Sequence, residues 1–182
     1  MLWDGSPRFI APRDEQEGGT WLGVNEFGGL VAITNRFGSR RDALTRSRGA
    51  LVVDALRGNT ATAACDIVTA HATNAQNPFH LVMADVIGAH LAWSEGEQMT
   101  HLRLDSGLHV VTERSFDAAP NGRSHFLERS IIELKAIDRL TPAAISRLLA
   151  VHRVDDIDAT CVLLPEFNYG TRSSTIIDTV QR

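Results

Sequence analysis

Two arginines lie two positions apart at the start of a predicted helix. Arg46 and Arg48 flank Ser47, and the segment Ser47–Arg57 has the apolar spacing of a helix that packs on one face. The exposed N–H groups of a helix N-terminus attract anions, and guanidinium groups add charge-assisted hydrogen bonds. Arg46 and Arg48 are therefore candidate ligands for a carboxylate or a phosphate, although a solvated helix entrance has the same residue pattern.

Two further segments carry side chains suited to binding a small molecule. Residues 18–23 read GGTWLG, and Trp21 is either a core anchor or an aromatic surface for a ligand. Tyr169, the single tyrosine of the chain, begins the hydroxyl-rich run YGTRSST, which also fits an alternating edge strand. Trp21 and Tyr169 are therefore candidate ligand-binding residues beside the two arginines.

A hairpin and two helices have to position the first of these segments. Thr20–Asn25 and Leu30–Asn35 are short β-branched and aromatic runs, separated by a Glu-Phe-Gly-Gly turn, and they predict a β-hairpin. After the helix over Ser47–Arg57, a second, alanine-rich helix is expected from about Thr60 to His71. Thr60 has the residue type preferred for capping that helix.

The remainder of the chain predicts a meander, two helices and two final strands. The expected meander strands are His80–Asp85, Ala89–Ser94, Met99–Leu104 and Leu108–Thr112. The expected helices cover Ser124–Ile137 and a segment that begins at Thr141, which caps it, followed by Pro142 in the favoured first position. The last strands are expected at Thr160–Leu164 and Ser173–Thr179.

This order of elements favours antiparallel sheets covered by helices, because a parallel sheet would need strict alternation of strands and helices. The predicted fold class is α+β. Residues 1–19 are rich in Pro, Gly and charge, and they predict a loop or a loosely attached arm with one extended piece at Arg8–Ala11. Periodicity alone does not distinguish two stacked sheets from a single sheet with helices on one side.

Composition limits the class of protein and its partners. The chain has 182 residues, 43% of them hydrophobic, and a net charge of −4, which predicts one globular domain over residues 1–182 and no nucleic-acid partner. Cys65 and Cys161 lie far apart and outside any ligand cluster, so no metal site is expected. No membrane span and no targeting signal is visible, and the expected location is the cytoplasm.

Four segments in this order resemble one known family. They are GGTWLGVNEFGGLVAITNR, RSRG followed by LVVDAL, NPFHLVMAD at residues 77–85, and YGTRSSTII near the end. The chain resembles the NRDE family, also called the transport and Golgi organisation protein 2 family. That family is similar to the N-terminal-nucleophile hydrolases, which implies a four-layer αββα sandwich. By the same resemblance the domain is expected to lack the opening strand and to be shortened at its N-terminus and its C-terminus.

The resemblance also implies a chemistry for which the nucleophile is missing. In the N-terminal-nucleophile fold a cysteine exposed by removal of Met attacks an amide, and its own α-amine acts as the general base. Residue 2 here is Leu2, so the chain as given is expected not to be an enzyme. Asn35 resembles the asparagine that donates to the oxyanion, and Arg172 resembles the arginine that orients the nucleophile or holds a substrate carboxylate. Glu113 stands where a second polar asparagine is expected, and a carboxylate cannot donate to an oxyanion.

The favoured function is therefore a non-catalytic, ligand-handling protein. The resemblance implies a small-molecule ligand such as haem or an acyl or lipid anion, and the cofactor is otherwise unknown. The alternatives are a cysteine-type amide hydrolase whose nucleophile lies upstream, and a degenerate paralogue with a structural or partner-binding role. A missing opening strand would also leave a sheet edge that pairs with another copy of the chain, giving a homo-oligomer.

Overall fold

A computed structural model describes residues 1–37, 45–70, 76–95, 98–114, 122–154 and 156–179. The chain divides into two compact units, the first formed by residues 1–107 with Thr179 and the second by Leu108–Asp178. Each unit has its own sheet and its own pair of helices.

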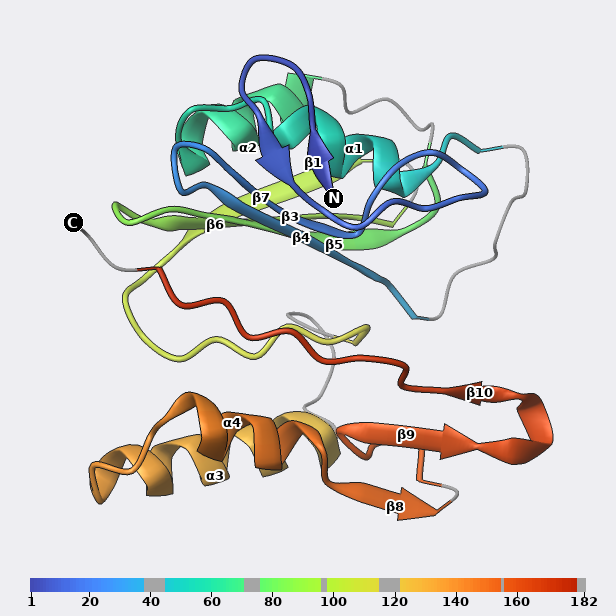
Figure 1. Ribbon diagram of the computed structural model, residues 1–182, viewed down its shortest axis with the longest axis vertical. Coiled ribbons are helices and arrows are strands. Elements are labelled where there is room, and N and C mark those ends of the chain that lie inside the picture. Colours follow the sequence, from blue (N-terminus) through green and yellow to red (C-terminus); the bar gives the residue numbers. More distant parts are fainter. Residues whose placement is uncertain (38–44, 71–75, 96–97, 115–121, 155, 180–182) are drawn as a thin grey trace. The chain divides into compact units, whose positions relative to one another are not determined.

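The first unit contains a seven-stranded antiparallel sheet in which every strand pairs with its neighbour in the chain (Figure 1). The strands are β1 (Leu2–Trp3), β2 (Phe9–Ile10), β3 (Leu22–Asn25), β4 (Leu30–Asn35), β5 (Phe79–Ala84), β6 (Ala89–Ser94) and β7 (Met99–Leu104). The predicted β3–β4 hairpin is confirmed, with Gly23 opposite Val31. The first three meander strands are confirmed as β5, β6 and β7.

Two helices, α1 (Arg48–Ala55) and α2 (Ala61–Ala70), cover one face of this sheet (Figure 1). Ser47 caps α1 by accepting a hydrogen bond from the N–H of Gly49, at 3.2 Å. Thr60 accepts from the N–H of Ala63 at 3.0 Å, which confirms its predicted capping role. His71, the last residue expected in the second helix, lies outside the described residues.

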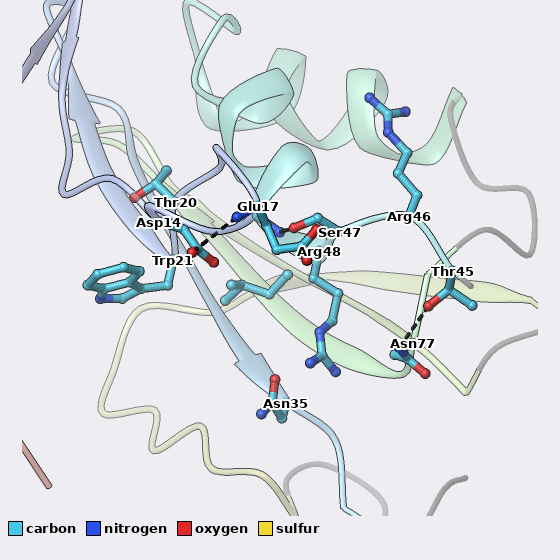
Figure 2. A pocket seen from close by; sticks show the side chains of 12 residues that line it. Asp14, Glu17, Thr20, Trp21, Asn35, Thr45, Arg46, Ser47, Arg48 and Asn77 are labelled. Atoms are coloured by element: carbon cyan, nitrogen blue, oxygen red, sulfur yellow. Dashed lines mark hydrogen bonds between the residues drawn. The ribbon is translucent and has the colours of Figure 1, made fainter. Parts of the chain in front are cut away.

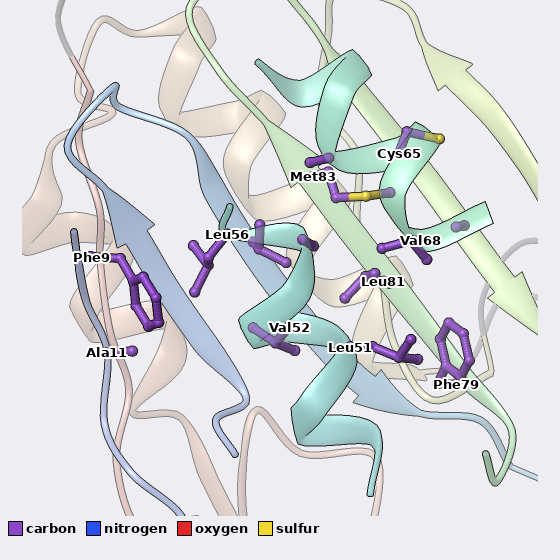
Figure 3. Packing of buried hydrophobic residues seen from close by; sticks show 14 residues of the cluster. Phe9, Ala11, Leu51, Val52, Leu56, Cys65, Val68, Phe79, Leu81 and Met83 are labelled. Carbon is purple, nitrogen blue, oxygen red and sulfur yellow. The ribbon is translucent and has the colours of Figure 1, made fainter. Parts of the chain in front are cut away.

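The core of the first unit lies between these helices and the sheet (Figure 3). Leu51 and Val52 of α1 pack in one cluster with Phe79 and Leu81 of β5, and none of the four is more than 1% exposed. The register places every second sheet residue, such as Val31 opposite Met83, on this face. Burial of these apolar side chains stabilises the unit, because each contributes roughly 1.5–3 kcal/mol relative to an exposed side chain.

The opposite face of the sheet is apolar as well. Leu30 pairs with Ala84, Val82 with Leu91, and Leu91 with Leu102. A sheet whose two faces are both apolar has the side-chain pattern of a sheet inside a layered sandwich, since a solvated face would alternate with polar residues.

A single carboxylate joins the β5–β6 turn to the start of α2. Asp85 accepts hydrogen bonds from the N–H groups of Ala61 at 2.7 Å, Ile87 at 2.7 Å and Gly88 at 2.9 Å. Burial raises the pKa of Asp85, but these three donors and the nearby His90 outweigh it, so the pKa lies below the ordinary value. Asp85 is therefore the structural anchor at the end of the NPFHLVMAD segment.

We expect Asp85→Asn to lower the free energy of unfolding by about 1 kcal/mol at pH 7, because an amide replaces the capping carboxylate. The folded-state pKa is depressed, so this stabilisation is present above the ordinary Asp pKa and is lost as the pH falls through the folded value. Urea unfolding at pH 7 and at pH 3 checks this, with Asp66→Asn on the exposed side of α2 as the control. If the free energies of unfolding of wild type and Asp85→Asn differ by the same amount at both pH values, the stabilising role of the ionised Asp85 carboxylate is contradicted.

The described residues of the second unit form two helices, three short strands and a 3-10 turn. The elements are α3 (Gly122–Ala136), α4 (Pro142–Leu149), β8 (His152–Val154), β9 (Cys161–Leu164), η1 (Pro165–Phe167) and β10 (Tyr169–Gly170). Both predicted helices are confirmed, and Thr141 caps α4 by accepting from the N–H of Ala144 at 3.2 Å. Strand β9 lies in the middle of the sheet, antiparallel to β10 and parallel to β8.

The expectation of a loosely attached N-terminal arm is wrong, whereas the extended piece predicted at Arg8–Ala11 is confirmed as β2. The amine of Met1 donates to the carbonyl of Ala11 at 2.9 Å, and the N–H of Ala11 donates back to Met1 at 3.1 Å. Trp3 stacks on Phe9 with ring centroids 5.2 Å apart, and Arg13 lies over the Trp3 ring. These contacts hold the first residues as two additional strands, which extend the sheet beyond β3.

Two predicted strands are also wrong, since Leu108–Thr112 and Ser173–Thr179 have no regular secondary structure. Both runs have strand-like residue types, but residue type alone does not supply a partner strand. The chain leaves the first unit after Gly107, so the fourth meander strand does not form beside β7. Pairing with β9 occurs earlier than predicted, at β10, and the hydroxyl of Thr171 then accepts from the N–H of Val162 at 3.0 Å.

The predicted α+β class is confirmed, and each of the two units combines one sheet with helices. Among the helices described, none combines the length and the apolar character needed for a bilayer span.

Candidate functional site

A pocket of about 400 Å³ opens in the first unit where α1 begins (Figure 2). Its lining comes from the segment before β3, from β4, from the start of α1 and the residues just before it, and from the turn that precedes β5. The lining residues are Asp14, Glu17, Thr20, Trp21, Ile33, Asn35, Thr45, Arg46, Ser47, Arg48, Gly49 and Asn77. The volume falls within the range of small-molecule sites, roughly 300–1,000 Å³.

A tight turn over residues 14–19 forms one wall of this pocket. The N–H of Asp14 donates to the carbonyl of Gly19 at 2.8 Å, and the N–H of Gly18 donates to the carbonyl of Asp14 at 2.9 Å. The side-chain Oδ1 of Asp14 accepts from the N–H groups of Gln16 and Glu17. Local side-chain bonds of this type fix the turn, and they fix the direction of the Asp14 carboxylate.

This wall contacts α1 through backbone alone. A Cβ atom added to Gly19 would lie 2.5 Å from the carbonyl carbon of Gly49, and the N–H of Thr20 donates to the Gly49 carbonyl at 3.3 Å. Glycine at both positions lets the two segments approach this closely. Gly19 is thus more than part of a strand-entry turn, because its close approach to Gly49 joins the turn over residues 14–19 to the start of α1.

The two predicted arginines differ in their environments. Arg48 is half-buried, and its Nη1 donates to the carbonyl of Pro78 at 3.0 Å. Arg46 is exposed, and its Nη2 lies 3.5 Å from Oδ2 of Asp54 on the outer side of α1. In Figure 2 the Arg46 side chain extends away from that of Arg48. Arg48 is therefore the arginine that the fold orients into the pocket.

Trp21, Ile33 and Asn35 line the same pocket along the hairpin. The N–H of Ile33 donates to the carbonyl of Trp21 at 3.0 Å, which continues the β3–β4 pairing by one residue. Trp21 is 51% exposed, so it is not a core anchor, and its ring is available to a ligand. The predicted site residues Trp21, Asn35, Arg46 and Arg48 are thus brought together.

Tyr169 and Arg172 are not among the residues that line this pocket, and they belong to the second unit. Tyr169 is 58% exposed and pairs with Leu164 in the β9–β10 ladder, while Arg172 is exposed and follows that ladder. Their binding roles stay predictions.

Glu113 has a structural partner in the second unit. Its Oε2 lies 2.9 Å from Nη1 of Arg123, whose Nε donates to the carbonyl of Ala159 at 3.0 Å. Arg123 thereby joins the start of α3 to the segment before β9. The carboxylate that replaces the expected asparagine thus anchors this arginine.

The two cysteines occupy unreactive or peripheral positions. Cys65 is 3% exposed in α2, and burial together with the nearby Asp66 raises the pKa of its thiol. Cys161 is half-buried in β9 of the second unit. Neither lines the pocket.

Sequence reasoning did not single out six polar residues that line the pocket: Asp14, Glu17, Thr20, Thr45, Ser47 and Asn77. The Nδ2 of Asn77 donates to the hydroxyl of Thr45 at 2.7 Å, a contact across 32 positions of sequence that no local pattern reveals. The turn at Asp14 could have been predicted from the sequence, since an Asp four residues before a Gly-Gly pair is a typical turn former.

These observations define an α+β protein with a small-molecule-sized pocket lined by charged, polar and aromatic side chains. The model of the family Transport and Golgi organisation 2 matches residues 1–182, and the chain belongs to that family. No curated protein matches the chain.

Proposed function

We propose that this chain is a non-catalytic, ligand-handling member of its family that binds a small molecule with an anionic group in the pocket beside α1. The observation that carries the proposal is the combination, in one cavity of about 400 Å³, of a half-buried arginine with an aromatic and an aliphatic side chain. Such a pocket offers an apolar surface for the body of a ligand and a few polar groups that orient it.

Arg48 is the residue we expect to hold the anion. A guanidinium has five donors in a planar fork, and the bond to Pro78 helps to set its orientation at the pocket. The side-chain amide of Asn35 at the end of β4 supplies a further donor in the same cavity. Trp21 and Ile33 provide the apolar contact.

We expect Arg48→Ala to weaken binding of an anionic ligand by about tenfold or more, which is the usual cost of losing a hydrogen bond to a charged group. Hemin and an acyl-CoA are suitable first probes. Hemin binding is measured by absorbance, and acyl-CoA binding is measured by calorimetry. Arg57→Ala, at an exposed arginine after α1, is the matched control. Absence of saturable binding to either probe, or equal affinity of Arg48→Ala and wild type, would contradict the proposal. Arg172→Ala tests separately whether the second predicted arginine takes part.

A second candidate is a cysteine-type amide hydrolase, favoured by the position of Asn35, whose amide lines the pocket as an oxyanion donor would. It requires a nucleophilic cysteine at the mature N-terminus, ahead of the residues given. Mass spectrometry of the N-terminal peptide of the native protein tests this requirement. A terminus at Met1 or Leu2 eliminates the hydrolase, whereas an upstream cysteine predicts amide turnover that disappears in its Cys→Ala variant.

A further inference from the structure

The pocket contains two carboxylates that a simple anion site would not have. Asp14 and Glu17 line the same cavity as Arg48. Negative charge repels a ligand that carries only negative groups, and like-charge contacts act against the wrong partner. The acidic wall therefore favours a ligand that carries a cationic group in addition to its anionic group.

Opposite charges are separated across the cavity. In Figure 2 Asp14 and Glu17 lie at the end where the Thr20 segment meets α1, while the guanidinium of Arg48 extends in the opposite direction, to the end where β4 finishes at Asn35. Arg46 does not change this division, because its guanidinium is directed to Asp54. One end of the pocket is thus acidic and the other end carries donors.

The Asp14 carboxylate of the acidic end is held in place by hydrogen bonds. Oδ1 of Asp14 is engaged by the N–H groups of Gln16 and Glu17, at 2.9 and 3.3 Å, and the turn is closed by the Asp14–Gly19 bond. The carboxylate is therefore held in one orientation before any ligand arrives. A preorganised acceptor costs less conformational entropy on binding than a free side chain.

We propose that the ligand of this pocket is a zwitterion of the amino-carboxylate class, with a free ammonium group and a free carboxylate, in the size range of a dipeptide. This inference rests on the proposed function, and it names the ligand class of the same site. The ammonium group binds Asp14 and Glu17, where the exposed ring of Trp21 adds a cation–π contact. The carboxylate binds the fork of Arg48, and Asn35 donates to it.

Each of the two ends of the pocket leads to its own prediction. Blocking the amine removes the cation that the ligand presents to the two carboxylates, and blocking the carboxylate removes the anion that it presents to Arg48. Each change is expected to weaken binding about tenfold, because one charge-assisted contact is lost in each case. The side chains of the ligand contact Trp21 and Ile33 in all forms, so apolar binding is common to the whole series.

The experiment uses the full chain and three probes: leucyl-phenylalanine, its N-acetyl derivative and its C-terminal amide. Titrations are followed by amide chemical shifts, which detect millimolar as well as micromolar affinities. The double variant Asp14→Asn with Glu17→Gln retains an acceptor oxygen for the turn and removes the charge. Glu15→Gln, an exposed carboxylate of the same turn that does not line the pocket, is its matched control.

For the wild type and the Glu15→Gln control we expect the free dipeptide to bind about tenfold more tightly than either blocked form. The double variant is expected to lose the preference for the free amine but keep the preference for the free carboxylate, and Arg48→Ala is expected to show the reverse. Equal affinity for all three probes, or no binding of any of them, overturns the proposal that the ligand is a zwitterion. If hemin or acyl-CoA still binds and depends on Arg48, the proposed function survives that failure. Thermal melting of each variant shows whether a loss of binding reflects a loss of fold.

Discussion

Replacing Asn25 by alanine is expected to lower the free energy of unfolding by about 3–5 kcal/mol, because the variant leaves several buried backbone groups without partners. Asn25 is 5% exposed at the end of β3. Its Nδ2 donates to the carbonyls of Leu56 at 3.0 Å and Gly58 at 2.8 Å. Its Oδ1 accepts from the N–H groups of Phe27 at 3.1 Å and Gly29 at 2.8 Å.

These four bonds use the full complement of the amide and join the β3–β4 turn to the connection between α1 and α2. Urea denaturation followed by circular dichroism measures the loss. Asn59→Ala, at an exposed asparagine in the same connection, is expected to change stability by less than about 0.5 kcal/mol. Asn25→Asp should also be strongly destabilising, since a carboxylate would face two carbonyls. An Asn25→Ala variant as stable as the Asn59→Ala control would refute this role.

Replacing Gly19 by alanine is expected to cost about 2–3 kcal/mol of stability and to abolish ligand binding in the pocket. The added Cβ would lie 2.5 Å from the carbonyl carbon and 2.8 Å from the Cα of Gly49, so one of the two backbones has to move. The Gly19 segment carries Asp14 and Glu17, and the Gly49 segment carries Arg48. The displacement therefore separates the two ends of the site.

Gly88→Ala is the matched control for this prediction. A Cβ at Gly88 would meet only the flexible end of the Arg103 side chain, at 3.2 Å, and we expect that variant to retain stability and binding. Thermal melting and the dipeptide and hemin titrations check both outcomes. A Gly19→Ala variant that binds as wild type would show that the close approach of the two backbones does not shape the pocket.

Several local elements of both units follow from residue type and spacing. The Gly-Gly turn between two β-branched runs predicts the β3–β4 hairpin, and Thr60 and Thr141 predict two helix starts, all of which are confirmed. These features depend on contacts within about four residues, which a sequence pattern records. The pair Arg46 and Arg48 at a helix start is also a local feature of the sequence, and both residues line the pocket.

Non-local pairing escaped the sequence analysis. Leu108–Thr112 and Ser173–Thr179 have β-branched residues like those of true strands, but they have no regular secondary structure. Leu2–Trp3 lacked a recognisable pattern, yet it forms a strand because the backbone of Met1 pairs with Ala11. Strand formation depends on a partner that is remote in sequence, and residue type does not specify that partner.

The sequence by itself determined the α+β class, the hairpin, the capped helices and an arginine pair with the spacing of an anion site. Only the tertiary structure decided which polar groups share the pocket. Asp14 meets Arg48 in one cavity because Gly19 and Gly49 let two backbones touch, and Asn77 reaches Thr45 across 32 positions. The physical reason is that caps and turns are satisfied within a few residues, whereas a binding site depends on the three-dimensional path of the whole chain.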